Sequence, residues 1–214
     1  MPARESEAII LRTYPFQEAD LIVSFFTRDQ GKLRGVAKRA RRPKSSFGAG
    51  LERLSYVRMF YRQREPLELV NLDSCELLRS AFHLEADYSA GVLLDYLAEV
   101  SEQLLPPAEP NERHFRLLLA VLEYLGERRA EGVWAAAAYF SLWAVRLAGF
   151  LPELRVGPES RALVEEMLAK PIRQLSPRQW SRETAADLRR SLVREIEQHI
   201  ERKLLTVKAL EGLP

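Results

Sequence analysis

The 214-residue sequence contains a single cysteine, Cys75. One cysteine excludes an internal disulfide and any cysteine-rich zinc site, and its simplest role is that of a small buried apolar residue. The longest apolar stretch, residues 133–145, is shorter than the about 20 residues of a membrane-spanning helix. The first seven residues mix charges of both signs, which is unlike a secretion signal. These absences predict a cytoplasmic protein.

Catalytic signatures are also missing. The three histidines, His83, His114 and His199, are scattered and have no cysteine or carboxylate at the spacing of a metal site. The sequence has no GxxxxGK[ST] loop for nucleotide hydrolysis, and Glu165–Glu166 fits surface charge better than a catalytic pair. We therefore expect no enzymatic activity, no cofactor and no metal.

What the sequence does contain is an uneven distribution of charge. The formal net charge is only +2, but residues 1–80 carry +5 and residues 81–214 carry −3. Between Gly31 and Arg64 there are 11 basic residues against one acidic residue, Glu52. A stretch with one sign of charge is typical of a surface that binds a polyanion, and it favours nucleic acid.

Apolar residues change their spacing near residue 80. Before it, short β-branched and aromatic runs separated by turn residues predict five strands, at residues 7–13, 20–27, 32–38, 54–64 and 67–72. Tyr14-Pro15-Phe16 and Glu65-Pro66 are predicted turns, and residues 39–50 a flexible basic loop. Five meandering strands within about 75 residues favour a small barrel such as an OB-fold, so we expect an OB-fold domain at residues 1–80.

After residue 80, apolar residues recur every three or four positions, which predicts helices. The expected helices cover residues 82–105, one that Asn111 caps and that ends near Gly126, residues 133–147 in the centre of a bundle, residues 159–169, and residues 182–207. In the last of these, Arg189, Arg190 and Arg194 lie off the apolar stripe. The expected fold class is α+β, with a helical domain at residues 81–214.

The fourth predicted strand interleaves aromatic residues with arginines. Tyr56, Arg58, Phe60, Arg62 and Arg64 share one face because side chains alternate along a strand. Proteins that bind single strands use this combination, in which bases stack on rings and arginines contact phosphates. The alternative is that Tyr56 and Phe60 face the core or a neighbouring domain.

The sequence resembles the RecO family of bacterial recombination mediators. The matching segments keep the family's order and spacing, and they are residues 7–12 (EAIILR), residues 18–23 (EADLIV) followed by Thr27 and Gly31, residues 35–45 (GVAKRARRPKS), residues 147–154 (LAGFLPEL) and residues 188–204. Many family members carry four zinc-ligating cysteines soon after the Leu-Pro-x-Leu connector. Residues 154–159 contain none, so this chain resembles a zinc-free member.

The resemblance implies a non-enzymatic, nucleoid-associated protein that binds single- and double-stranded DNA and anneals complementary strands. It implies that the protein acts with RecR to displace or remodel single-strand-binding protein so that RecA can load, and that the helical domain holds the acidic C-terminal tail of single-strand-binding protein. The expected DNA-binding residues are Lys32, Arg34, Lys38, Arg39, Arg41, Arg42, Lys44, Arg58, Phe60, Arg62 and Arg64. The candidates for binding a partner are Arg128, Arg129 and Arg146.

A second interpretation belongs to another class of protein. The basic segment could serve an adaptor that docks acidic partner tails, with DNA binding incidental. The basic loop has no Asn or Gln among its charges, so side chains that read bases are scarce there and any DNA binding is expected to be non-specific.

Overall fold

The computed structural model describes residues 3–63 and 69–214, which form two compact units. The first unit contains the described residues up to His83 together with Leu105–Phe115. The second contains Leu84–Leu104 and Arg116–Pro214. Helix α3 (Glu112–Arg128) therefore gives its first turn to the first unit and the rest of its length to the second.

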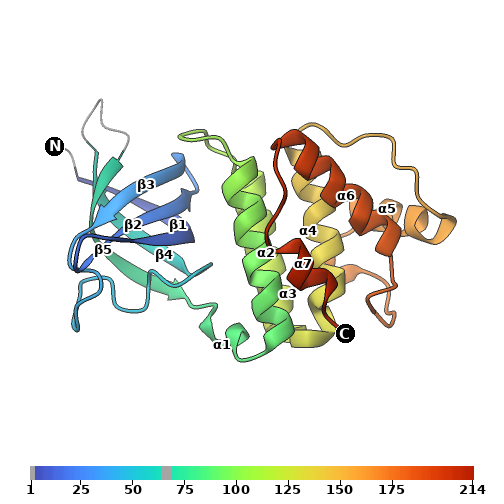
Figure 1. The fold of residues 1–214 in the computed structure, drawn as a ribbon, viewed down its shortest axis with the longest axis horizontal. Coiled ribbons are helices and arrows are strands. Elements are labelled where there is room, and N and C mark those ends of the chain that lie inside the picture. Colours follow the sequence, from blue (N-terminus) through green and yellow to red (C-terminus); the bar gives the residue numbers. More distant parts are fainter. Residues whose placement is uncertain (1–2, 64–68) are drawn as a thin grey trace. The chain divides into compact units, whose positions relative to one another are not determined.

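Five strands close into a barrel in the first unit (Figure 1). They are β1 (Ala3–Phe16), β2 (Asp20–Thr27), β3 (Gly31–Ala37), β4 (Tyr56–Arg62) and β5 (Leu69–Arg79). The order around the barrel is β1-β2-β3-β5-β4. Among the pairings of these five strands as described, β3 and β5 pair in parallel and the other four pairings are antiparallel. This is the expected OB-fold, and the helices that follow give the expected α+β class.

Alternating side chains fill the barrel. On β4, Val57, Met59 and Tyr61 are buried, whereas Tyr56 and the other alternate residues are not. Val23 and Phe25 of β2 belong to the same core. Because the side-chain period of a strand is two, the sequence parity of β4 assigned its faces correctly.

Several predicted strand boundaries are wrong. Strand β1 begins at Ala3 and not at Glu7, and β4 covers Tyr56–Arg62 and not residues 54–64. Tyr14-Pro15-Phe16 is not a turn, because β1 continues through it and pairs with β2 as far as Phe16 opposite Asp20. The turn comes after it, and Gln17 has a φ of 52°. Strand β5 extends beyond the expected end at Leu72 to Arg79, because its second half pairs with β4. The predicted turn Glu65-Pro66 and the start of the fifth strand lie outside the described residues.

The second unit is helical. Its elements are α1 (Phe82–Glu85, whose first two residues belong to the barrel unit), α2 (Tyr88–Leu104), the remainder of α3, a 3-10 turn η1 (Arg129–Gly132), α4 (Val133–Leu147), α5 (Pro158–Ala169), a 3-10 turn η2 (Ile172–Gln174), α6 (Ala186–His199) and α7 (Val207–Glu211). Helix α4 is buried on nearly every side and packs against α2, α5 and α6, as its apolar sequence predicted. The Asn111 cap is confirmed, since its Oδ1 accepts the His114 N–H at 3.0 Å.

Two of the predicted helices are interrupted. The helix expected at residues 82–105 is α1 and α2, and Asp87 Oδ1 accepts the Ala90 N–H at 2.9 Å at the start of α2. The helix expected at residues 182–207 is shorter than predicted: α6 covers Ala186–His199, residues 200–206 are not helical, and α7 begins only at Val207. Between them Glu201 has a φ of 54°, and the Glu99 carboxylate of α2 accepts the backbone N–H groups of Leu205 and Thr206 at 2.8 and 2.9 Å. A carboxylate distant in sequence thus replaces the hydrogen bonds that would continue the helix.

The position of Arg189 is a further correction. The sequence pattern predicted it off the buried stripe of its helix, but it is only 2% exposed. Its guanidinium lies 4.3 Å from the centroid of the Trp134 ring and donates to the carbonyl groups of Thr184 and Arg182. Burial lowers the pKa of Arg189, and Glu211 partly offsets this. Arg189 is therefore a structural cation that joins α6 to the Trp134 face of α4.

Candidate nucleic-acid interface

The predicted basic loop lies in the connection between β3 and β4, residues 38–55. This whole connection is called the basic loop from here on, and it closes one end of the barrel. Its apolar side chains Phe47 and Leu51 are 4% and 8% exposed and belong to the barrel core. Ser46 Oγ donates to the Asp73 carbonyl at 2.8 Å, and Cys75 N–H donates to the Ser46 carbonyl at 3.4 Å. The second half of the loop is thus anchored to β5, which corrects the expectation of a flexible loop.

The first half of the loop is anchored to the turn between β1 and β2. Arg39 N–H donates to Asp20 Oδ1 at 2.8 Å, and Arg41 N–H donates to the Ala19 carbonyl at 3.0 Å. Arg39 and Lys44 have left-handed backbones, with φ of 56° and 62°, which is uncommon for residues other than glycine. The loop therefore presents its cations from a defined backbone.

Five cations in the first half of this loop have no carboxylate partner within the described part of the chain. The side chains of Lys38, Arg39, Arg41, Arg42 and Lys44 are all exposed, and none forms an ion pair with a described carboxylate. Arg41 also donates from its guanidinium to the Glu18 carbonyl at 3.3 Å. Five cations held over seven residues on one fixed loop form a surface suited to a phosphate backbone.

The cations of β4 are in a different electrostatic state. Arg58 Nη1 lies 2.9 Å from Glu76 Oε2, and Arg62 forms a two-pronged ion pair with Asp73, with Nη2 to Oδ1 at 2.5 Å. Both carboxylates come from the neighbouring strand β5, so phosphate must compete with them for these arginines. Phe60 lies between the two arginines on the same outward face and is half-buried.

Two other expected residues of the outward face differ in their surroundings. Tyr56 packs edge-on against Phe115, with ring centroids 6.0 Å apart. Burial is the largest cause that raises the pKa of Tyr56, and a hydrogen bond with Glu7 raises it further. Tyr56 thus packs against Phe115 in the first turn of α3, which belongs to the same unit. This contact fits the alternative that Tyr56 packs within the protein. Arg64 lies outside the described residues.

On β3, Lys32 and Arg34 point away from the core. The alternation of buried Leu33, Gly35 and Ala37 places them on the outer face. Arg34 is exposed, and Lys32 is half-buried beside the Leu105–Phe115 segment, where its carbonyl accepts the Ala108 N–H at 2.9 Å.

Sequence reasoning missed a set of residues next to this loop. Arg12, Tyr14 and Phe16 share one outward face of β1, and both aromatic side chains are 36% exposed. The Arg12 guanidinium lies 5.7 Å from the centroid of the Tyr14 ring. The signal in the sequence was an alternation of Arg, Tyr and Phe, which the assignment of a turn to Tyr14-Pro15-Phe16 concealed.

The helical unit contains a separate hollow of about 390 Å³ that includes one predicted partner-binding residue, Arg128. Its wall combines aromatic and apolar side chains with three arginines and one carboxylate, and its residues include Tyr124, Arg128, Glu131, Ile172, Arg173, Leu175, Arg178 and Trp180. Arg173 is paired with Glu123 and Glu127, whereas Arg128 forms no ion pair with a described carboxylate. Arg129 and Arg146 do not line this hollow, and the Arg146 guanidinium lies 5.2 Å from the centroid of the Trp143 ring.

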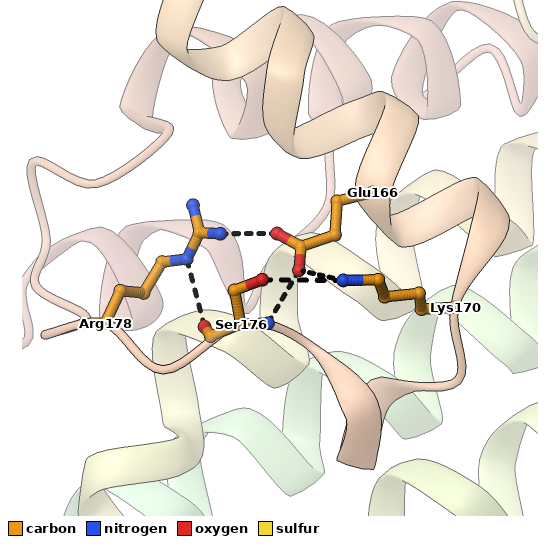
Figure 2. A network of polar contacts seen from close by, with 4 residues as sticks. All are labelled: Glu166, Lys170, Ser176 and Arg178. Atoms are coloured by element: carbon orange, nitrogen blue, oxygen red, sulfur yellow. Dashed lines mark hydrogen bonds and ion pairs between the residues drawn. The ribbon is translucent and has the colours of Figure 1, made fainter.

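The carboxylate of Glu166, which is mostly buried, holds the segment at one side of this hollow. Glu166 accepts the Ser176 N–H at 2.6 Å and an ammonium hydrogen of Lys170 at 3.2 Å, and it pairs with Arg178 (Figure 2). Hydrogen bonds from Ser176 are the largest cause that lowers the pKa of Glu166 to about 2. The network holds the segment that carries Leu175, Pro177 and Trp180 against α5.

No group of three or more His, Cys, Asp or Glu side chains in residues 3–63 and 69–214 is arranged to hold a metal ion. Among the helices described here, none has the length and apolar character needed to span a membrane.

Comparison with known proteins gives consistent matches along the chain. The model of the family Recombination protein O N terminal matches residues 1–81, and that of Recombination protein O C terminal matches residues 85–157. The DNA repair protein RecO of Koribacter versatilis is 42% identical over 244 aligned residues, which cover 98% of this chain and 99% of that protein.

More distant relatives match a shorter part. The DNA repair protein RecO of Bifidobacterium adolescentis is 34% identical over 157 residues, covering 73% of this chain and 63% of that protein. The protein of the same name from Cutibacterium acnes is 33% identical over 158 residues, covering 72% of this chain and 64% of that protein.

Proposed function

Since this chain belongs to the RecO family of DNA repair proteins, we propose that it acts as a recombination mediator that binds single- and double-stranded DNA and anneals complementary strands. The observation that supports this proposal is the anchored loop whose five exposed cations lack carboxylate partners in the described chain. A fixed array of this kind favours a polyanion, because no internal ion pair has to be broken before phosphate binds.

The annealing activity follows from charge neutralisation. Phosphates on two complementary strands repel each other, and cations that bind both backbones lower this repulsion so that base pairing can begin. Arginines and lysines recognise phosphates of any sequence, and the loop contains no Asn or Gln to read bases. The binding is therefore non-specific with respect to sequence.

The proposal includes cooperation with other repair proteins. The protein acts with RecR on strands covered by single-strand-binding protein and remodels this cover so that RecA can load. The decisive experiment measures annealing of complementary strands precoated with the cognate single-strand-binding protein, with and without this protein. We expect acceleration by the wild-type protein and little by a variant with alanine at Lys38, Arg39, Arg41 and Arg42. No acceleration by the wild-type protein would refute the mediator function.

The hollow of the helical unit favours a second function, which is to dock the acidic C-terminal tail of single-strand-binding protein. Apolar walls at Ile172, Leu175 and Trp180 suit the apolar side chains of a peptide, and Arg128 on the rim suits its carboxylates. Titration of a labelled tail peptide tests this. Arg128→Ala should weaken binding about 5- to 50-fold, whereas Arg146→Ala, which removes the same charge outside the hollow, should leave it unchanged.

The adaptor interpretation predicts a different combination of results. Under it, the loop variant would lose binding to an acidic partner peptide, and the wild-type protein would not anneal naked complementary strands. Annealing of naked DNA by the wild-type protein, abolished in the loop variant, favours the mediator.

A further inference from the structure

The end of the β1–β2 hairpin is exposed on both of its sides. Every residue from Arg12 to Glu18 is exposed, although residues 12–16 are paired in register with β2. The β-bulge at Leu11 separates this stretch from the preceding part of β1, where residues 8–11 are buried. Two of its exposed side chains are the aromatic rings of Tyr14 and Phe16. Polar side chains at these two exposed positions would not destabilise the barrel.

Strand register shows which side chains accompany these rings. Arg12 is opposite Ser24, and Ser24 is opposite Arg34 on β3, so the three residues form one row across the outward face. Tyr14 lies in the next row, opposite Ile22, which is opposite Val36. Paired residues share a face of the sheet, so two arginines flank Ser24 immediately beside the Tyr14 row.

The basic loop lies beside the same hairpin. Arg41 donates to the carbonyls of Glu18 and Ala19 in the hairpin turn, and Arg39 N–H is held by Asp20. Arginines at positions 12, 39, 41 and 42 outnumber the nearby carboxylates of Glu18 and Asp20. Exposed rings surrounded by a surplus of cations complement a ligand that has both aromatic faces and negative charge, which is the chemistry of a nucleic acid strand.

The spacing of the rings favours a single strand over a duplex. Tyr14 and Phe16 are two residues apart on one face, or about 7 Å at the usual rise of a strand. This is about twice the ~3.4 Å rise per base of a duplex strand. Bases within a duplex already stack on one another, whereas bases of an extended single strand are separated and accessible.

We infer that Tyr14 and Phe16 form a base-stacking platform for single-stranded nucleic acid. This inference rests on the proposed function and assigns a further part of the same interface. The anchored loop binds the phosphates of any strand, and the platform adds affinity only for strands with unpaired bases. The platform therefore gives this protein a preference for single strands over duplex.

The test compares three ligands by fluorescence anisotropy: an oligothymidylate, an abasic oligonucleotide of the same length, and a duplex. The first two ligands present the same phosphates and differ only in their bases. The wild-type protein should therefore bind oligothymidylate more tightly than the abasic strand. The variant Tyr14→Ala/Phe16→Ala should lose about tenfold or more in affinity for oligothymidylate. Its affinities for the abasic strand and the duplex should stay within about twofold of wild type.

Three further variants make the result decisive. Tyr14→Leu/Phe16→Leu keeps apolar bulk in the strand and should show the same selective loss, while Tyr14→Trp should retain the preference. Tyr88→Ala, at a tyrosine that is 75% exposed on α2, is the matched control and should change nothing.

Equal losses on all three ligands would overturn the platform, as would unchanged binding of oligothymidylate by both double variants, which would point to a protein partner for the rings. A wild-type protein that binds DNA without preferring oligothymidylate to the abasic strand would overturn the platform and leave the proposed function standing. A wild-type protein that binds no DNA would instead refute the proposed function.

Discussion

Replacing four of the loop cations tests the nucleic-acid interface most directly. In the variant with alanine at Lys38, Arg39, Arg41 and Arg42, only Lys44 remains of the five exposed and unpaired cations. Lys38 and Arg42 have no hydrogen bond from their side chains to the described chain, and Arg39 is held through its backbone N–H. We therefore expect the variant to keep the barrel fold.

The magnitude follows from counterion release. Each phosphate neutralised on a single strand contributes about −0.7 to the slope of log K against log salt. If each loop cation binds one phosphate, five give a slope of about −3.5 and one gives about −0.7. If affinities converge near 1 M salt, the difference amounts to about 2.8 decades at 0.1 M, or roughly 600-fold in affinity.

The measurement is a salt series of fluorescence anisotropy titrations with a labelled single strand. A matched control replaces four exposed cations of the helical unit, Arg161, Arg182, Arg202 and Lys208, so that the net charge changes equally. The control should keep the wild-type slope within about one unit. The assignment of the loop would be refuted if the two variants showed the same slope, or if the loop variant kept the slope of the wild-type protein.

Three further predictions concern stability. Phe47→Ala removes a ring that the loop inserts into the barrel core, so it should lower the free energy of unfolding by about 3–5 kcal/mol in a denaturant titration. Ser46→Ala should lower it by only about 1 kcal/mol, and equal losses would contradict a structural role for the Phe47 ring in the core. Burial lowers the pKa of His114 to about 4, so its neutral form stabilises the fold above about pH 6.5. Up to about 3 kcal/mol of the free energy of unfolding should be lost as the pH falls from 6.5 to 4. Chemical denaturation across that range should show this loss in the wild type and not in His114→Phe. The pKa of Glu166 is lowered to about 2, so its contribution is present above its ordinary pKa near 4.5 and is lost as the pH falls toward 2. The difference in melting temperature between wild type and Glu166→Gln should therefore narrow over that interval, and a constant difference would show that the carboxylate charge does not matter.

The sequence by itself determined the architecture and the location of the charge. Period-two runs before residue 80 and helical periods after it follow from backbone geometry that local residues already express. The concentration of cations between residues 31 and 64 is a property of composition and needs no fold. The two faces of β4 were also readable, because parity alone decides which side chains of a strand point inward.

Only the tertiary structure decided which cations are available to a ligand. The sequence predicted Arg58 and Arg62 to bind DNA just as it did Arg41 and Arg42, but β5 places Glu76 and Asp73 beside the first two. Arg189 is buried against Trp134, a residue 55 positions earlier in the chain. Ion pairing and burial depend on neighbours that are distant in sequence, so no local pattern can report them.

The same reason explains the loop and the hairpin. In the sequence, Phe47 and Leu51 are ordinary loop residues, and only the folded barrel provides the core in which they are buried. Tyr14-Pro15-Phe16 has the composition of a turn, and only its pairing with β2 makes it part of a strand. The sequence therefore determined that this protein has a basic barrel. The packing of the chain determined that the loop cations stand on a fixed support beside two exposed rings.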